Sequence, residues 1–191
     1  MRILPRSFYD RPAIEVAKAL LGKVVVHGEC AGRIVEVEAY LGEKDPAAHA
    51  ARGLTPRTKV IYGPPGHAYV YFIYGMHECL NIVAEPEGSP GCVLIRALEP
   101  LAGIEQMRAR RGVTKLTDLM SGPGKLTQAM AITRELNGRD VTKGDFTVRT
   151  DGTPEPTDYL VTPRIGISVA ESWELRFVLN NTRYASRHPR R

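Results

Sequence analysis

The sequence lacks the features that mark disulfide-rich, secreted and membrane proteins. Its three cysteines, Cys30, Cys79 and Cys92, form neither an even set nor a Cys-x-x-Cys motif, so free thiols in a reducing compartment are the simplest interpretation. The apolar runs are far shorter than the roughly 20 residues of a membrane-spanning helix. Residues 1–7 contain no long apolar stretch of the kind found in signal peptides. We therefore expect no membrane partner and a cytoplasmic location.

Length and composition fit one globular domain. The 191 residues are too few for two ordinary domains with separate cores. The hydrophobic content of 43% and charged content of 25% are typical of globular proteins. The sequence shows no internal repeat and no low-complexity linker. We predict a single, monomeric domain over residues 1–191, with the basic residues 187–191 as a candidate disordered tail.

Positive charge is in excess and is concentrated near the end of the chain. The 26 Lys and Arg residues outnumber the 21 Asp and Glu residues, for a formal net charge of +5. Residues 164–191 hold six arginines and two glutamates. A basic surface suits nucleic acid or another anionic partner, but charge alone does not establish one.

Local patterns predict strands and helices without a regular β-α-β alternation. A helix over 13–21 has Asp10 as its candidate cap and Gly22 as its end. Strands are expected over 23–26, 32–41, 68–74, 79–84 and 92–98, with strand-like residues at 161–167 and 175–179. Further helices are expected over 45–49, from Pro100 to about Arg111, and over 126–136. The mixture favours an α+β domain over a doubly wound fold.

Two glutamates alternate on the predicted strand 32–41. Strict alternation places Ile34, Glu36, Glu38 and Tyr40 on one face. Carboxylates that face a pocket can act as general bases, and a like-charged neighbour raises the pKa of one of them. The pattern also fits a solvated face on which both glutamates pair with Lys or Arg across the sheet. Alternation alone does not decide between these interpretations.

Tyrosines crowd the next predicted hairpin. Tyr69, Tyr71 and Tyr74 fall within six positions, and residues 79–84 are the expected partner strand. The tyrosines fit either cross-strand packing within the sheet or an aromatic surface on which nucleic-acid bases stack. Tyr74 precedes Gly75 at the expected tip, where an exposed ring suits insertion between bases.

The sequence Ser-Gly-Pro-Gly-Lys at 121–125 is not a phosphate-binding P-loop. A P-loop has glycine five residues before its Gly-Lys pair and Ser or Thr after it, whereas Leu119 and Leu126 hold those positions. The glycines and Lys125 fit either a single phosphate at a helix N-terminus or an ordinary helix entry. No metal site and no cofactor are expected, because the histidines form no i, i+4 pair and the cysteines no cluster.

Several of these segments recur in one known order. They are RIVEVEAYLG at 33–42, DPAAH at 45–49, YVYFIYGM at 69–76, NI at 81–82, VLIRALEP at 93–100 and SGPGKL at 121–126. In this combination the chain resembles, over nearly its whole length, the alkyladenine (3-methyladenine) DNA glycosylases of the mammalian type. The resemblance implies a compact α+β domain around a curved antiparallel β-sheet, with a protruding β-hairpin and surrounding helices.

The resemblance implies a monofunctional DNA glycosylase of base-excision repair. Such an enzyme flips a damaged purine, of the 3-methyladenine, 7-methylguanine and hypoxanthine class, out of double-stranded DNA. An activated water then hydrolyses the N-glycosidic bond and leaves an abasic site. Damaged duplex DNA is thus the implied partner. Neutral lesions such as hypoxanthine also need a proton on the leaving base, and the sequence identifies no acid for that step.

The resemblance also implies roles for individual residues. Glu38 matches the base that activates water, and Arg96 matches its partner. The residues implied to form the base pocket are Tyr40, His49, Tyr71, Asn81, Cys92 and Leu94, of which Asn81 matches the side chain that crowds the amine of normal guanine. Tyr74 matches the side chain that intercalates into the duplex. Contacts with the DNA backbone are assigned to Arg57, Lys59 and Lys125.

Two other functions remain open at this point. A non-catalytic nucleic-acid-binding domain would use the same aromatic and basic side chains, although a carboxylate such as Glu38 near a phosphate-rich ligand weakens binding. A hydrolase of free nucleosides or of another glycoside would use Glu36 and Glu38 as a carboxyl pair. Neighbours on one strand face, however, do not flank a bond as such a pair must.

Overall fold

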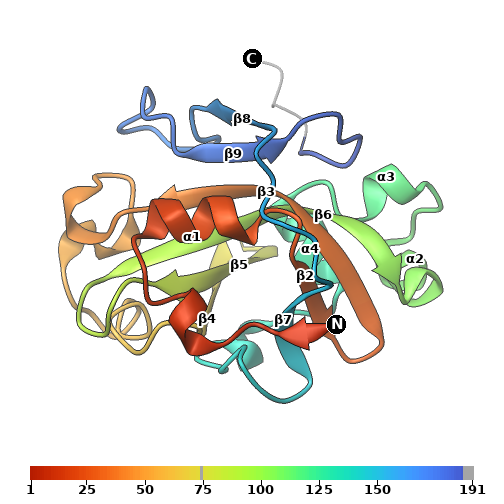
Figure 1. Cartoon of the computed structure of the whole chain (residues 1–191), viewed down its shortest axis with the longest axis horizontal. Helices are drawn as coiled ribbons and strands as arrows, with labels where there is room; N and C mark the ends of the chain where they lie inside the picture. The colour runs from red at the N-terminus through yellow and green to blue at the C-terminus, as the bar shows by residue number, and fades with distance from the viewer. Residues whose placement is uncertain (74, 187–191) are drawn as a thin grey trace.

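A curved antiparallel β-sheet forms the centre of the protein. The computed structural model describes residues 1–73 and 75–186. Within them, nine strands pair in the order β1-β7-β2-β3-β6-β5-β4, with β9 joined to β3 and β8 to β9 (Figure 1). The strands are β1 (Arg2–Ile3), β2 (Val24–His27), β3 (Cys30–Tyr40), β4 (Ala68–Ile73), β5 (His77–Ala84), β6 (Gly91–Ala102), β7 (Phe146–Thr150), β8 (Tyr159–Thr162) and β9 (Arg176–Leu179).

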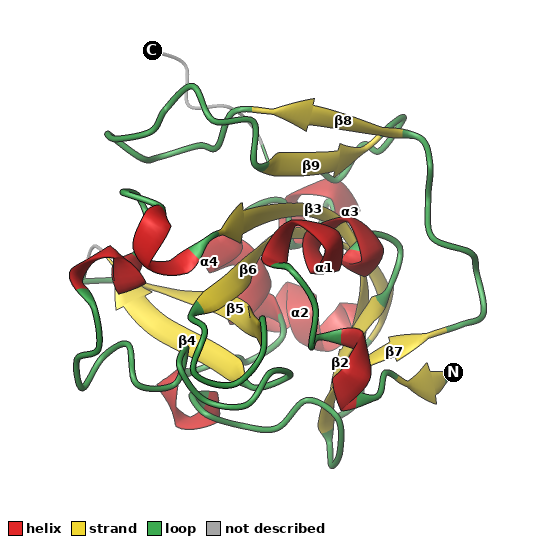
Figure 2. Ribbon diagram, turned by 60° about the vertical axis from the view of Figure 1, so that its left-hand side comes forward, coloured by secondary structure: helices red, strands yellow, loops and turns green. Residues whose placement is uncertain are grey.

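Helices surround this sheet (Figure 2). The α-helices are α1 (Ala13–Leu20), α2 (Ile104–Arg111), α3 (Leu116–Leu119) and α4 (Pro123–Ala129), and short 3₁₀ helices occupy η1 (Arg6–Phe8), η2 (Gly42–Lys44), η3 (His49–Arg52) and η4 (Arg134–Leu136). α1 packs against β3 and β6, and α4 packs against β5 and β6. Leu20 of α1, Leu126 of α4 and Ile95 of β6 belong to one buried apolar cluster. The expected α+β class is confirmed.

The long strands β3 and β6 form the ladder on which the site is built. β6 lies along one edge of β3, while the other edge changes partner from β2, at residues 30–33, to β9, at residues 36–38. The register with β6 shifts on both sides of Glu36, which marks a β-bulge. A bulge bends a strand and increases its twist. At this point the sheet branches, and the β8–β9 pair extends from the edge of β3, above the other strands in Figure 1.

The predicted tyrosine-rich hairpin is confirmed. β4 and β5 pair from Ala68 with Ile82 to Ile73 with His77.

The predicted start of a helix at Pro100 is wrong. Strand β6 continues through Pro100 to Ala102, and Gly103, at φ +72°, separates this strand from α2.

The helix predicted over 126–136 is also wrong in its extent. α4 begins at Pro123, whose missing N–H and fixed φ suit the first helical position. It ends at Ala129, and Ala131, at φ +53°, breaks the chain direction before η4. Residues 165–167, predicted as strand-like, lie in the loop between β8 and β9. Over residues 1–73 and 75–186, none of the helices combines the length and the apolar character needed to cross a bilayer.

The predicted cap of α1 is replaced by a residue from elsewhere in the chain. Asp10 makes no cap, because the helix begins only after Pro12. The Ala13 N–H instead donates to Glu85 Oε1 at 2.7 Å. The predicted end is confirmed, since Gly22 follows the helix at φ +79°, a conformation that favours glycine.

Candidate active site

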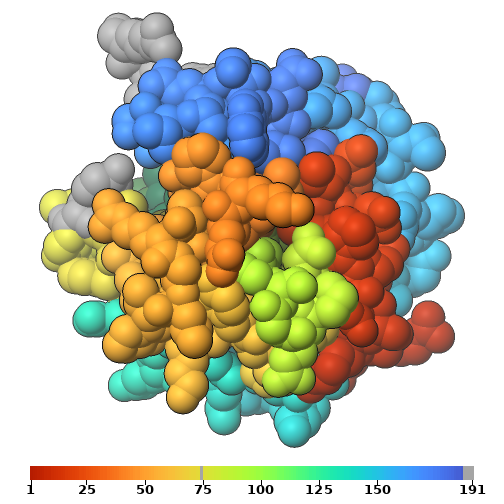
Figure 3. Space-filling model, turned by 90° about the vertical axis from the view of Figure 1, so that its left-hand side faces the viewer, coloured from red at the N-terminus to blue at the C-terminus, as the bar shows by residue number. Residues whose placement is uncertain are grey.

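A cavity of about 420 Å³ lies between the β4–β5–β6 part of the sheet and the loop that follows β8. Its volume falls within the range of small-molecule sites, about 300–1,000 Å³. Its lining includes Tyr40, His49, Tyr69, Tyr71, His77, Cys79, Asn81, Cys92, Leu94, Arg96, Gly124 and Ile165. The structure thus brings together all six residues that the resemblance assigned to a base pocket. On the face drawn in Figure 3, the segment that follows β3 (orange) meets the C-terminal segment (blue).

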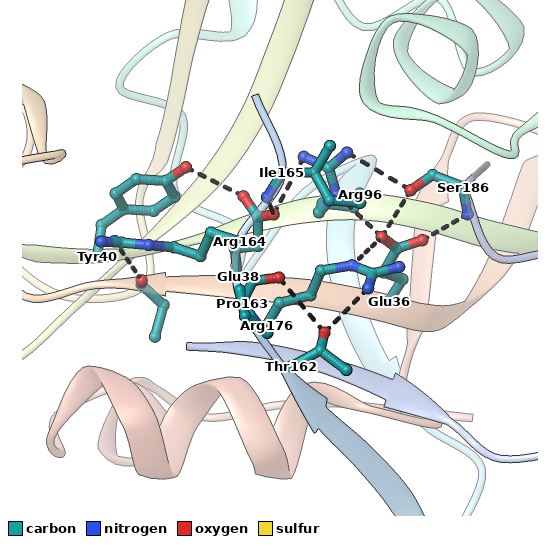
Figure 4. Close-up of polar contacts among 11 residues, drawn as sticks. Glu36, Glu38, Tyr40, Arg96, Thr162, Pro163, Arg164, Ile165, Arg176 and Ser186 are labelled. Carbon is teal, nitrogen blue, oxygen red and sulfur yellow. Dashed lines mark hydrogen bonds and ion pairs between the residues drawn. The ribbon is translucent and has the colours of Figure 1, made fainter. Parts of the chain in front are cut away.

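Glu38 lies in β3 directly behind the cavity wall and is fully buried. Its Oε1 accepts the Ile165 N–H at 2.8 Å and lies 3.3 Å from Arg96 Nη1, while its Oε2 accepts the Tyr40 hydroxyl at 3.0 Å (Figure 4). All three neighbours line the cavity. Burial raises the pKa of Glu38 above the ordinary 4.5, although Arg96 and the two hydrogen bonds oppose the rise. The interpretation as a solvated face is therefore wrong, whereas the pairing with arginines across the sheet that it included is confirmed, by Arg96 of β6 and Arg176 of β9.

Glu36 is equally buried but is enclosed by donors. Its carboxylate accepts Arg96 Nε at 3.0 Å, Arg176 Nε at 2.7 Å, and the Ser186 N–H and hydroxyl at 2.5 and 2.6 Å. Burial alone would raise its pKa, but the two guanidinium groups and Ser186 outweigh burial and lower it. Glu36 is thus a fixed anion and does not form a catalytic carboxyl pair with Glu38. In the part of the chain that the structure describes, no three His, Cys, Asp or Glu residues are grouped as metal ligands.

The bulge in β3 changes which residues share a face. Strict alternation placed Ile34 beside Glu36 and Glu38, and this prediction is wrong. Ile34 lies in the main apolar core together with Val37 and Ala39. The extra residue at the bulge reverses the alternation, so the core side of β3 changes from even to odd positions.

A second buried ion pair fixes the loop that carries Ile165. Arg164 Nη1 and Nη2 donate to Asp45 at 2.5 and 2.8 Å, and neither side chain has exposed surface. The same guanidinium lies 4.6 Å from the centre of the Tyr40 ring. The helix predicted over 45–49 is wrong, because the 3₁₀ helix begins only at His49. Arg164 gave no local signal in the sequence because its partner is distant along the chain.

Gly42 allows the chain to turn from β3 toward Asp45. It adopts φ +71°, and a Cβ at this position would collide with the backbone carbonyl of Pro90. Only glycine fits both the conformation and the space. The turn lets Asp45 accept the Leu41 and Ala47 N–H groups in addition to Arg164.

His49 and Tyr71 form the aromatic wall on the hairpin side. Their ring centres lie 4.5 Å apart in an edge-to-face arrangement at 74°. His49 Nδ1 lies 2.9 Å from the hydroxyl of Tyr69. Tyr69 also lines the cavity, whereas the sequence did not decide whether this tyrosine packs within the sheet or stacks on a base. Burial, helped by the charges of Arg57 and Arg52, lowers the pKa of His49 to about 4. The ring is therefore neutral at physiological pH.

We expect His49 to titrate near pH 4 rather than near its ordinary 6.5. Because the folded-state pKa is lowered, stability is expected to be fully present above the unfolded pKa and to fall as the pH drops from about 6.5 toward about 4. An NMR titration of the imidazole nitrogens measures the midpoint directly, and Arg57→Gln should move it upward. A wild-type midpoint near 6.5 would show that the ring is solvated and not part of a closed wall.

Strands β5 and β6 supply the remaining polar surface of the cavity. Asn81 pairs in register with Leu94. Its Nδ2 donates to the Tyr69 carbonyl at 3.2 Å, and Cys92 Sγ lies 3.9 Å from its Oδ1. Burial raises the pKa of Cys92 to about 12, so the thiol stays protonated. The amide of Asn81 is therefore held in one orientation.

The residues assigned to DNA contacts differ in their surroundings. The Arg57 guanidinium lies 5.2 Å from the centre of the Tyr71 ring and 3.4 Å from His49 Nε2, so it contacts the pocket wall. Lys59 is exposed. Lys125 donates to Ser121 Oγ at 3.3 Å. Tyr74, assigned to intercalation, lies outside the described residues.

Comparison with known proteins supports one family for this arrangement. Residues 7–183 match the family model described as methylpurine-DNA glycosylase. A Methanoculleus marisnigri protein named "Putative 3-methyladenine DNA glycosylase" is 52% identical over 190 residues, covering 96% of this chain and 98% of the relative. A Legionella pneumophila protein of the same name is 47% identical over 194 residues, covering 98% of this chain and 100% of the relative.

Proposed function

The chain belongs to the methylpurine-DNA glycosylase family, hydrolases that act on N-glycosyl bonds, and from this premise we propose that it excises damaged purines from duplex DNA. The proposed substrates are bases of the 3-methyladenine, 7-methylguanine and hypoxanthine class. The observation that carries the proposal is a buried carboxylate, Glu38, whose hydrogen-bond partners Ile165 and Tyr40 line a cavity of about 420 Å³ with aromatic side chains in its wall. No cofactor takes part in the proposed reaction.

The cavity suits a purine that has been rotated out of the duplex. A base inside a duplex cannot be attacked at its glycosidic bond, so it must first be flipped into a pocket. Tyr40, His49 and Tyr71 all line the cavity, and the rings of His49 and Tyr71 lie 4.5 Å apart, which gives aromatic surfaces for stacking. Purines methylated at N3 or N7 are cationic, and they gain a cation–π attraction from such rings. In this proposal the fixed amide of Asn81 excludes the exocyclic amine of normal guanine.

The proposed reaction is hydrolysis by a water that Glu38 activates. A carboxylate has about four acceptor sites; in Glu38 the Ile165 N–H and the Tyr40 hydroxyl donate to one oxygen each, and Arg96 forms an ion pair with Oε1. We place the attacking water on the remaining acceptor site of Oε2. Its oxygen attacks C1′ as the bond to the purine nitrogen breaks, and the electron pair of that bond stays on the purine, so that a cationic methylated purine leaves as the neutral base. Glu38 takes the proton, and its negative charge also stabilises the cationic sugar of the transition state. Its raised pKa makes it a stronger base than an ordinary glutamate.

Release of methylated bases from alkylated duplex DNA tests this function. The expected products are free 3-methyladenine and 7-methylguanine, detected chromatographically, together with DNA that breaks only after alkali treatment, as an abasic site does. Undamaged duplex should release no guanine. Strand breaks without alkali, or no free base from any lesion, would contradict the proposal.

A further inference from the structure

We infer that the chain segment 184–186 is a positioning element of the active site, in which Ser186 holds Glu36 and thereby sets how Arg96 is shared between Glu36 and Glu38. Residues 184–186 follow the part of the chain that matches the family model, which ends at residue 183. The inference rests on the proposed function, because it concerns the residue proposed to activate water.

Ser186 touches both members of the ion pair behind the cavity. Its N–H donates to Glu36 Oε2 at 2.5 Å, and its hydroxyl donates to Glu36 Oε1 at 2.6 Å. The same hydroxyl oxygen accepts Arg96 Nη2 at 3.4 Å. Figure 4 shows Ser186 beside Glu36 and Arg96, on the side opposite Tyr40. One side chain from the end of the described chain thus completes a network that begins on β3 and β6.

The segment that carries Ser186 is anchored beside this network. Tyr184 is 7% exposed and packs with Val35 and Ala97, the chain neighbours of Glu36 and Arg96. The Tyr184 N–H donates to Thr182 Oγ1 at 3.2 Å. Packing of Tyr184 therefore places Ser186 against the bulge in β3, where Glu36 lies.

Arg96 forms ion pairs with two buried carboxylates, Glu36 and Glu38. A change in the hydrogen bonds of Glu36 therefore alters how strongly Arg96 stabilises the charge of Glu38. Arg96 Nε binds Glu36 at 3.0 Å, and its Nη1 lies 3.3 Å from Glu38. Ser186 satisfies Glu36 with two hydrogen bonds, which leaves the Nη1 side of the guanidinium for Glu38. Without the Ser186 hydroxyl, Glu36 loses a donor and draws Arg96 toward itself. Glu38 then has less compensation for its burial, and its pKa rises further.

Other charged and titratable groups also face Glu38. They are Glu36 and Tyr40 from β3, Arg96 from β6, Cys79 from β5 and Arg164 from the loop after β8. Ser186 contacts only Glu36 and Arg96 of this set. A change of the Ser186 hydroxyl therefore acts on Glu38 through Arg96.

The test is the pH–rate profile of Ser186→Ala in single-turnover base release from a duplex with one 7-methylguanine. We expect the rate on the acid limb, below its midpoint, to fall about threefold, the factor that corresponds to half a pH unit, while the rate on the plateau changes little. We also expect the acid limb of the profile to move to higher pH by about half a unit. Ser186→Thr, which keeps the hydroxyl, should restore the wild-type limb. A purely structural role would lower the active fraction without moving the limb.

Two shortened chains separate this role from that of the basic residues that follow. A chain ending at Ser186 lacks Arg187, Arg190 and Arg191. We expect it to lose only DNA affinity and to keep the acid limb of the pH–rate profile at the wild-type pH. For a chain ending at Arg183 we expect slower base release and an acid limb at higher pH. A wild-type limb in Ser186→Ala, or in the chain ending at Arg183, overturns the inference. If the wild-type protein itself releases no base, the proposed function fails instead.

Discussion

Glu38→Gln is expected to lower the single-turnover rate of base release by about 10²- to 10⁴-fold, the usual contribution of a general base. Glutamine has nearly the same shape and can still accept the Ile165 N–H, but it cannot take a proton from water. It also removes the negative charge that stabilises the cationic sugar. Binding to a lesion duplex should change little, because the cavity walls stay in place. The measurement is base release alongside binding of the same duplex.

Glu43→Gln is a matched control for this substitution. Glu43 is an exposed glutamate five residues further along, bound to the Tyr62 hydroxyl at 2.6 Å, and its change should leave the rate unaltered. Release by Glu38→Gln within about threefold of wild type would remove Glu38 from the role of base. Both variants lose one negative charge, so a difference between their rates of base release comes from the position of Glu38 in the site and not from the change in net charge.

Glu38→Gln is also expected not to destabilise the protein near neutral pH. The folded-state pKa of Glu38 is raised, so its contribution to stability is present below the unfolded pKa and is lost as the pH rises through the folded pKa. At neutral pH the ionised form is a cost that glutamine avoids. The midpoint of thermal unfolding is therefore expected to equal or exceed that of the wild type, because residues of functional sites are often not the most stabilising ones for the fold.

Asp45→Ala is expected to lower the free energy of unfolding by about 3–5 kcal/mol, the usual cost of removing one partner of a buried ion pair. The substitution leaves the Arg164 guanidinium, which has no exposed surface, without its counter-charge. It also frees the loop whose Ile165 N–H binds Glu38, so base release should fall as well. Urea denaturation measures the stability change.

The exposed pair of Asp145 and Arg139 provides the control for Asp45→Ala. Their side chains are 69% and 58% exposed and lie 3.7 Å apart, so Asp145→Ala should have only a small effect. Equal, small effects of Asp45→Ala and Asp145→Ala would contradict the structural importance assigned to the Asp45–Arg164 pair.

Features that depend on neighbouring residues were predictable from the sequence. The aromatic and β-branched residues before Gly75 and the apolar residues after it predicted the hairpin of β4 and β5 with nearly correct bounds. The six pocket residues were identified through the resemblance to a known family. In the structure their segments lie on adjacent strands and on the turn after β3. Alternation alone would not have assembled them, because they come from β3, β4, β5, β6 and η3.

Features that depend on distant residues were not predictable. Glu85 replaced Asp10 as the acceptor at the start of α1 because the chain folds back 72 residues later. The bulge in β3 moved Ile34 into the core because β9 takes over from β2 at that point. Arg164 and Ser186 lie 119 and 150 residues from their carboxylate partners, Asp45 and Glu36. Hydrophobic periodicity holds no information about such pairs.

The most direct test of the claim that Glu38 activates water is the pH–rate profile of the wild-type protein on a duplex with one 7-methylguanine. This base is already cationic and leaves without protonation, so the profile reports the base alone. We predict a rate that rises with pH along a limb above the ordinary glutamate value of 4.5 and then levels off, and that Glu38→Gln lacks this limb. A wild-type rate independent of pH, or a limb that survives in Glu38→Gln, would contradict the account.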